Sequence, residues 1–185
     1  ITSDFAAGSS GSPVAWTSAT AGTLRMCAGT FYTTLALGSN VEVHGAGSDR
    51  TVINAGGQGA GLSTSGANVT VADLTITGGT GIYDANLLET AGGGLLCSGG
   101  SVVADRIALT GNTARFGSGV AVGNGCALTL RNATVTGNAA TYNGGGAVTV
   151  YLATAALQDV KISGNTGSGA YVVQGNLDVV RGIIT

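Results

Sequence analysis

The stretch that decides the fold is ATVTGNAATYNGGGAVTV, residues 133–150. Its two ends, ATVT and AVTV, alternate larger apolar residues with small ones, and glycine and asparagine are concentrated between them. Alternation with a period of two predicts a half-buried strand, while glycine and asparagine favour bends. No segment of the chain shows the sustained period of about 3.6 residues that is typical of a helix. The sequence therefore predicts short strands separated by bends, with helices nearly absent.

The same unit recurs along the chain. Its strand-and-turn part reads LTITGG at 74–79, IALTGN at 107–112, ATVTGN at 133–138 and VKISGN at 160–165. A short alternating strand precedes each copy, and a glycine-rich segment that leads into an apolar run follows it. One coil of three short strands cannot bury its apolar side alone, whereas stacked coils bury a continuous core. We therefore predict an all-β fold, a single-chain, three-sided parallel β-helix of roughly six to seven coils.

The chain divides into two parts. Residues 1–22 are a low-complexity segment and a candidate N-terminal cap, and residues 23–185 are expected to form the β-helix. The last apolar run ends inside a coil, and an uncovered coil exposes unpaired strand edges. We therefore expect the array to continue in a longer chain or to be covered by a partner, including another copy of itself stacked end to end.

Composition excludes several classes of protein. Charged residues make up 9% of the chain and hydrophobic residues 44%, which excludes intrinsic disorder. Seven Lys and Arg residues and a net charge of −2 argue against nucleic-acid binding. No apolar run has the length of a membrane-spanning helix. The shortage of charge and the abundance of Gly, Thr, Ala, Ser and Asn suit an extracellular or cell-surface protein, although no signal peptide is visible in this chain.

The cysteines and the single histidine give little sign of a reactive or metal site. Cys27, Cys97 and Cys126 form no CxxC pair. We interpret them as small buried apolar residues, with a Cys97–Cys126 disulfide as the alternative. His44 lies at the end of a strand without a recognisable nucleophile partner, so we assign no catalytic residue. No metal site and no cofactor are predicted; Ca²⁺ bound by carboxylates is a further alternative.

Two stretches resemble known families. RMCAGTFYTTLALGSNVEVHGAGSDRTVINA, residues 25–55, resembles the first coils of right-handed, pectin-lyase-like β-helix proteins. The TVTGN…GGGAV units resemble the repeats of polymorphic outer-membrane-type surface proteins, whose hallmark is GGA(I/L/V) with an upstream FxxN. Here Phe116 and Tyr142 lead into the glycine-rich segments, and the FxxN motif is degenerate. The resemblance covers nearly the whole chain from Thr23 and implies a right-handed β-helix. It implies no single activity, because this fold carries lyases, hydrolases, adhesins and structural tails.

Aligned repeats turn into columns of side chains that run along the solenoid. One column lies at the bend before each strand of the repeat and comprises Asp73, Arg106, Asn132, Asp159 and Arg181. A second comprises Asn112, Asn138 and Asn165. We interpret both as structural ladders of turns, hydrogen bonds and weak ion pairs. The alternative for the first column is a carbohydrate or Ca²⁺ site in which Asp73 and Asp105 are the candidate carboxylate pair.

Three further features are candidates for binding. Thr77, Thr110, Thr136 and Ser163 form a hydroxyl column, but Ala108 and Lys161 interrupt the row beside it, which argues against an ice-binding face. Phe116, Tyr142 and Tyr171 form an aromatic column, interpreted as packing, with a sugar platform as the alternative. Residues 80–91 interrupt the repeat, and loops on a rigid solenoid carry binding residues. Within this insertion the candidate partner contacts are Tyr83, Asp84, Asn86 and Glu89.

These observations favour one function over two others. We expect a non-catalytic extracellular or cell-surface module with a structural or adhesive role, able to assemble end to end. Its partners would be copies of itself, further coils of a longer chain, glycans or host and cell-surface molecules. The alternatives are a polysaccharide lyase or hydrolase, and a hydroxyl face that binds ice or glycan.

Overall fold

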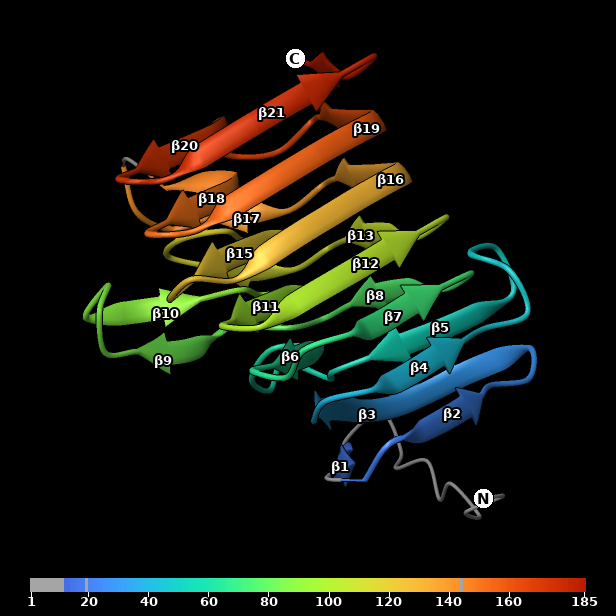
Figure 1. The fold of residues 1–185 in the computed structure, drawn as a ribbon. Coiled ribbons are helices and arrows are strands. Elements are labelled where there is room, and N and C mark those ends of the chain that lie inside the picture. The colour runs from blue at the N-terminus through green and yellow to red at the C-terminus, as the bar shows by residue number, and fades with distance from the viewer. Residues whose placement is uncertain (1–11, 19, 144) are drawn as a thin grey trace.

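The protein is a parallel β-solenoid of about six turns, with the N-terminal end at the bottom of Figure 1 and the C-terminal end at the top. The computed structural model describes residues 12–18, 20–143 and 145–185. These residues form no helix, and so none that is long and apolar enough to cross a membrane. The expected parallel β-helix is thus confirmed.

Each turn contributes strands to three faces, and on each face the strands pair in parallel with those of the turns above and below. Face 1 comprises β2 (Gly22–Arg25), β4 (Val41–His44), β7 (Val69–Ala72), β12 (Ser101–Asp105), the first parts of β16 (Ala127–Thr136) and β19 (Thr154–Ser163), and β21 (Asn176–Val180). Face 2 comprises the first part of β3 (Gly29–Leu37), β5 (Thr51–Asn54), β8 (Thr75–Thr77), β13 (Ala108–Thr110), the second parts of β16 and β19, and β22 (Ile183–Ile184). Face 3 comprises β1 (Val14–Ser18), the second part of β3, β6 (Leu62–Thr64), β11 (Leu95–Ser98), β15 (Val120–Gly123), β18 (Gly146–Tyr151) and β20 (Ser168–Val173).

Two short pairs lie outside these faces. An antiparallel hairpin of β9 (Ile82–Asp84) and β10 (Glu89–Ala91) projects sideways from the stack, on the left in Figure 1. A short parallel pair of β14 (Thr113–Ala114) and β17 (Ala139–Ala140) lies between faces 2 and 3. The insertion predicted at residues 80–91 is therefore a hairpin.

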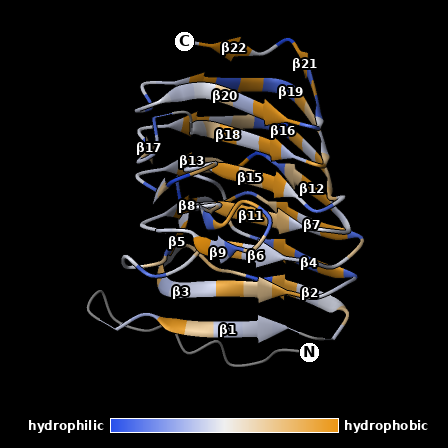
Figure 2. Ribbon diagram, turned by 90° about the vertical axis from the view of Figure 1, so that its left-hand side faces the viewer, coloured by the Kyte–Doolittle hydropathy of each residue, from blue (hydrophilic) through white to orange (hydrophobic). Residues whose placement is uncertain are grey.

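The core is a set of apolar columns, one residue per turn. Leu109, Val135 and Ile162 are in register on face 2 and are fully buried, because a further turn covers each of them. Ile184 continues the column on the last described turn, where it is 44% exposed. The hydropathy colouring in Figure 2 shows apolar residues recurring along the strands of successive turns. Val135 thus faces inward, and burial of a column position depends on having a turn on both sides.

The solenoid begins before the residue expected. β1 pairs in parallel with β3, so Val14–Ser18 already forms a strand of face 3. Trp16 of this strand packs against the main core. Residues 1–11 and residue 19 of the candidate cap lie outside the described residues.

Two of the three cysteines are paired, which corrects the interpretation of all three as unpaired buried residues. A disulfide joins Cys97 in β11 to Cys126 in the turn before β16, one coil further on, with their Cα atoms 6.0 Å apart. That distance lies within the ordinary range of disulfides. Both residues are buried, as expected, while Cys27 is free and exposed. The pairing escaped the repeat alignment because Cys97 is in register with Val122 and not with Cys126.

Candidate binding surface

The bend column runs along the corner between faces 1 and 2. Its five members have backbone φ angles between 50° and 60°. This left-handed conformation is costly for most residues, but Asp and Asn tolerate it because their short side chains bond to nearby backbone. The residue types at this column are thus explained in part by the bend itself. The arginines in it need a further compensation, which their ion pairs supply.

Charged side chains of this column link one coil to the next. The Arg106 guanidinium donates to both carboxylate oxygens of Asp73 in the preceding coil, at 2.7 and 2.9 Å, and also contacts Asp105. Asn132 donates to Asp105 Oδ1 at 2.8 Å, and Arg131 lies 3.4 Å from the other oxygen of that carboxylate. Arg106 therefore occupies the space between the two members of the candidate carboxylate pair.

These contacts keep the carboxyl groups ionised. The hydrogen bond from Arg106 lowers the pKa of Asp73. Burial acts to raise the pKa of Asp105, but the hydrogen bond from Asn132 and the charges of Arg106 and Arg131 outweigh it, so that this pKa is also lowered. A glycosidase needs one carboxyl with a raised pKa to act as the acid. Asp73 and Asp105 have the opposite property, so their chemistry fits cross-linking better than proton donation.

A second arginine–aspartate pair links the last two members of the bend column. Arg181 donates through two nitrogens to the two oxygens of Asp159, both at 2.7 Å, and this hydrogen bonding lowers the pKa of Asp159. Both side chains are largely exposed, so the pair is weaker than its geometry suggests.

The asparagine column lies inside the solenoid and forms a continuous hydrogen-bonded ladder. Asn138 Oδ1 accepts the backbone N–H of Asn112 at 3.0 Å, and its Nδ2 donates to the carbonyl of Leu109 at 2.9 Å. Asn165 repeats these contacts one coil further, with the N–H of Asn138 at 2.9 Å and the carbonyl of Val135 at 2.8 Å. The column therefore satisfies buried backbone groups at a turn and presents nothing to a ligand.

The outer side of face 2 carries the hydroxyl column. Thr110 is in register with Thr136, and Thr136 with Ser163. The neighbouring row contains Ala108 and Lys161 in register with Thr134, as the sequence indicated. The second regular row of hydroxyls is thus interrupted.

His44 lies at the end of β4 on face 1, in register with Ala72 and so next to the bend column at Asp73. Its Nε2 is 3.4 Å from Glu42 Oε2, which also accepts a hydrogen bond from Thr23. This geometry places the histidine in a surface hydrogen-bonded group with Glu42 and Thr23 and gives it no nucleophile to activate.

The projecting hairpin is anchored by two of its four candidate binding residues. Asp84 is 7% exposed; its Oδ1 accepts the N–H groups of Asn86 and Leu87 at 2.8 and 3.1 Å, and its Oδ2 accepts Asn124 Nδ2 at 3.2 Å. Asn86 in turn donates its side-chain amide to Asn124 Oδ1. Asp84 and Asn86 therefore hold the hairpin against the solenoid through these hydrogen bonds, and their binding role stays a prediction.

The other two hairpin residues differ from each other. Tyr83 is 62% exposed. Glu89 pairs with Arg115, whose Nε lies 3.1 Å from Glu89 Oε2. Beneath the hairpin, Leu87 and Phe116 pack on a small second core of Ala60, Ala91, Leu96 and Ala121. The hairpin thus covers part of the outer side of face 3.

Next to the hairpin, three rings from successive coils meet. Phe116 lies 5.1 Å from Tyr142 and 5.9 Å from Tyr171, measured between ring centroids, with interplanar angles of 46° and 25°. The guanidinium carbon of Arg115 stands 5.1 Å from the centroid of Tyr142. We refer to Arg115, Phe116, Tyr142 and Tyr171 as the aromatic corner. The predicted aromatic column is therefore a packed cluster, in which Tyr142 still has 44% of its surface exposed.

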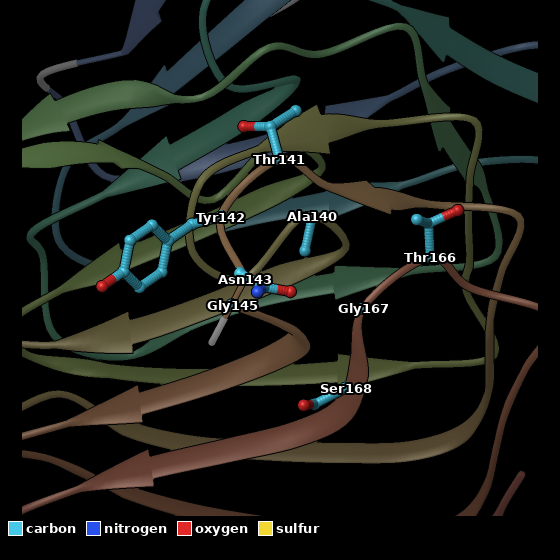
Figure 3. Close-up of a pocket in the computed structure, with 8 residues that line it drawn as sticks. All are labelled: Ala140, Thr141, Tyr142, Asn143, Gly145, Thr166, Gly167 and Ser168. Carbon is cyan, nitrogen blue, oxygen red and sulfur yellow. The ribbon is translucent and has the colours of Figure 1, made fainter.

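An open cavity of about 380 Å³ adjoins Tyr142 (Figure 3). Its lining comprises Ala140, Thr141, Tyr142, Asn143, Gly145, Thr166, Gly167 and Ser168. The cavity forms because two successive coils differ in length at this corner. Asn138 and Asn165 share a column, and Gly146 pairs with Ser168. The chain therefore uses residues 138–146 in one coil to cover the distance that residues 165–168 cover in the next. Sequence reasoning missed the polar lining, and the unequal turn length was the signal that would have revealed it.

Comparison of the chain with protein-family models, curated proteins and solved structures finds no match. Over the described ranges there is also no group of three or more His, Cys, Asp or Glu side chains placed to hold a metal ion.

Proposed function

We propose that this protein is a non-catalytic extracellular or cell-surface β-solenoid module with a structural and adhesive role. The observation that supports the proposal most strongly is that the carboxyl groups of the bend column are bound by arginines and not left free for catalysis. The carboxylates of Asp73, Asp105 and Asp159 are engaged by arginines of their own or neighbouring coils, with lowered pKa values. Groups held in this way stiffen a stack of coils and are poorly suited to acid catalysis.

The disulfide supports the extracellular location. Cys97 and Cys126 are buried and join two adjacent coils. Disulfides persist in oxidising compartments and are rare in the cytosol. A rigid stack that is cross-linked in this way suits a module that must keep its shape outside the cell.

The adhesive part of the proposal rests on the surface of face 3. The hairpin and the aromatic corner interrupt an otherwise regular surface and present exposed Tyr83 and Tyr142. Rigid scaffolds commonly carry their recognition residues on such excursions. Tyrosine is favoured in recognition because it offers a large contact area with little loss of conformational entropy.

The test has two readouts. The labelled chain is incubated with whole cells and with insoluble polysaccharides, and retention after washing is measured against a reduced, unfolded sample. In parallel, soluble acidic and neutral polysaccharides are incubated with the chain, with and without Ca²⁺, and the release of reducing ends and of unsaturated uronates is followed.

We expect retention without product release. Release of products that is lost in Asp105→Asn would contradict the proposal and establish a hydrolase or lyase. Absence of retention on every surface would contradict the adhesive role.

A further inference from the structure

We propose that the cavity beside Tyr142 binds a neutral saccharide unit, with the Tyr142 ring as the stacking platform and the surrounding hydroxyl and amide groups as hydrogen-bonding partners. This inference rests on the proposed adhesive role and names the chemical class of its ligand. It depends on the ring, the polar lining, the size of the cavity and its charge.

The ring is held in place before any ligand arrives. Phe116 contacts Tyr142 from the preceding coil at 5.1 Å, and Arg115 stands 5.1 Å from the ring centroid. Arg115 also forms an ion pair with Glu89 of the hairpin, with Nε and Oε2 3.1 Å apart. Tyr142 nevertheless remains 44% exposed. A fixed, half-exposed ring can contact the C–H side of a sugar without first losing side-chain entropy.

The lining supplies polar groups that the protein does not use. The side chains of Thr141, Asn143, Thr166 and Ser168 are exposed and make no hydrogen bond to another described residue. The N–H groups of Tyr142 and Asn143 likewise donate to none of the described residues. Hydroxyls and an amide both donate and accept, as sugar hydroxyls do. Figure 3 shows Thr141 and Asn143 on one turn and Thr166 and Ser168 on the next, with the Tyr142 ring extending to one side of them.

The size of the cavity and the lack of charge on its described lining restrict the class of ligand. About 380 Å³ lies near the lower end of the roughly 300–1,000 Å³ typical of small-molecule sites, which suits a mono- or disaccharide unit. The described lining residues carry no charged side chain. Arg115, which stands over the Tyr142 ring, is paired with Glu89. Since nothing on the lining would compensate a buried carboxylate, we infer a neutral sugar and not a polyuronate.

The inference is tested by titrating the intact chain with a panel of neutral mono- and disaccharides and with di- and trigalacturonate, observed by saturation-transfer NMR and isothermal calorimetry. Tyr142→Ala removes the platform. The matched control is Tyr151→Ala, which removes a half-buried tyrosine of the same coil at the other end of β18. Thermal unfolding of both variants shows that they are folded.

We expect at least one neutral saccharide to bind and the galacturonates to bind more weakly. Tyr142→Ala should weaken binding about tenfold, Ser168→Ala a few-fold, and Tyr151→Ala less than twofold. Unchanged affinity in Tyr142→Ala, stronger binding of the galacturonates, or failure of every neutral saccharide to bind would overturn the proposed site.

The outcome separates this inference from the function on which it rests. Retention on cells without binding of any neutral saccharide overturns the saccharide site and leaves the adhesive role intact. Saccharide binding at Tyr142 accompanied by product release keeps the site and overturns the non-catalytic function.

Discussion

The asparagine ladder and the cavity beside Tyr142 both contain asparagine side chains, yet these are used in opposite ways. Asn112 and Asn138 are buried, and each side-chain amide is bonded to the neighbouring coil. Asn143, beside the corner, is exposed and bonds to no described side chain. The same residue type thus stabilises the stack at one column and is left available at the other. The difference indicates which surface is free to recognise a ligand.

The largest expected effect comes from charging the main apolar core, on which the whole stack of coils depends. Val135→Asp would place an unpaired carboxylate at a fully buried position, and we expect a loss of more than about 4 kcal/mol, enough to unfold the array locally or wholly. Thr136→Asp, one residue on and facing outward, should change stability by less than about 1 kcal/mol. Chemical denaturation followed by circular dichroism measures both. Equal stability of the two variants would disprove the assigned facing.

The disulfide should have the next largest effect. Replacing both Cys97 and Cys126 by serine removes a cross-link between adjacent coils, and we expect a loss of about 2–4 kcal/mol in the free energy of unfolding. Cys27→Ser, at a free and exposed position, should leave stability unchanged. A double serine variant as stable as the parent chain would contradict the cross-linking role.

Substituting one asparagine of each kind tests whether the ladder and the cavity really differ. Asn138→Ala leaves buried backbone groups of neighbouring coils without partners and should cost about 1–3 kcal/mol. Asn143→Ala should cost less than about 0.5 kcal/mol and should weaken saccharide binding. Denaturant titrations of the two variants are compared directly. Similar losses at both positions would show that the corner is a structural element like the ladder.

The smallest expected effect is a loss of stability at acid pH. The pKa values of Asp73, Asp105 and Asp159 are lowered in the folded protein. The stability that these ionised groups contribute is therefore fully present above the ordinary carboxyl pKa of about 3.9. It is lost as the pH falls through the lowered values. We expect the melting temperature to be flat from neutral pH to about pH 5 and to fall below about pH 4. Asp105→Asn should flatten that acid limb. A melting temperature that rises on acidification would contradict the ionised, arginine-paired state.

The sequence predicted the repeating columns and the place of the insertion at residues 80–91, and it missed contacts that depend on the path of single turns. The columns through Asp73, Asn138 and Val135 were predictable because equivalent residues in successive coils have similar types. The disulfide was predicted only as the alternative, since Cys97 and Cys126 occupy different columns and become neighbours only through the path of a turn. The anchoring of Asp84 required knowing that its hairpin folds back onto Asn124. The cavity required knowing that two consecutive turns differ in length.

The central claim is that the asparagine ladder holds the coils together while the polar groups of the cavity beside Tyr142 are left free for a ligand. Hydrogen exchange of individual amides tests this claim most directly. The N–H groups of Gly79, Asn112 and Asn138 donate to the side-chain Oδ1 atom of the ladder asparagine in the next coil and should exchange slowly. Those of Tyr142 and Asn143 should exchange fast and slow down when a bound neutral saccharide is added. Slow exchange at Tyr142 and Asn143 in the free protein, or fast exchange along the ladder, would contradict the account.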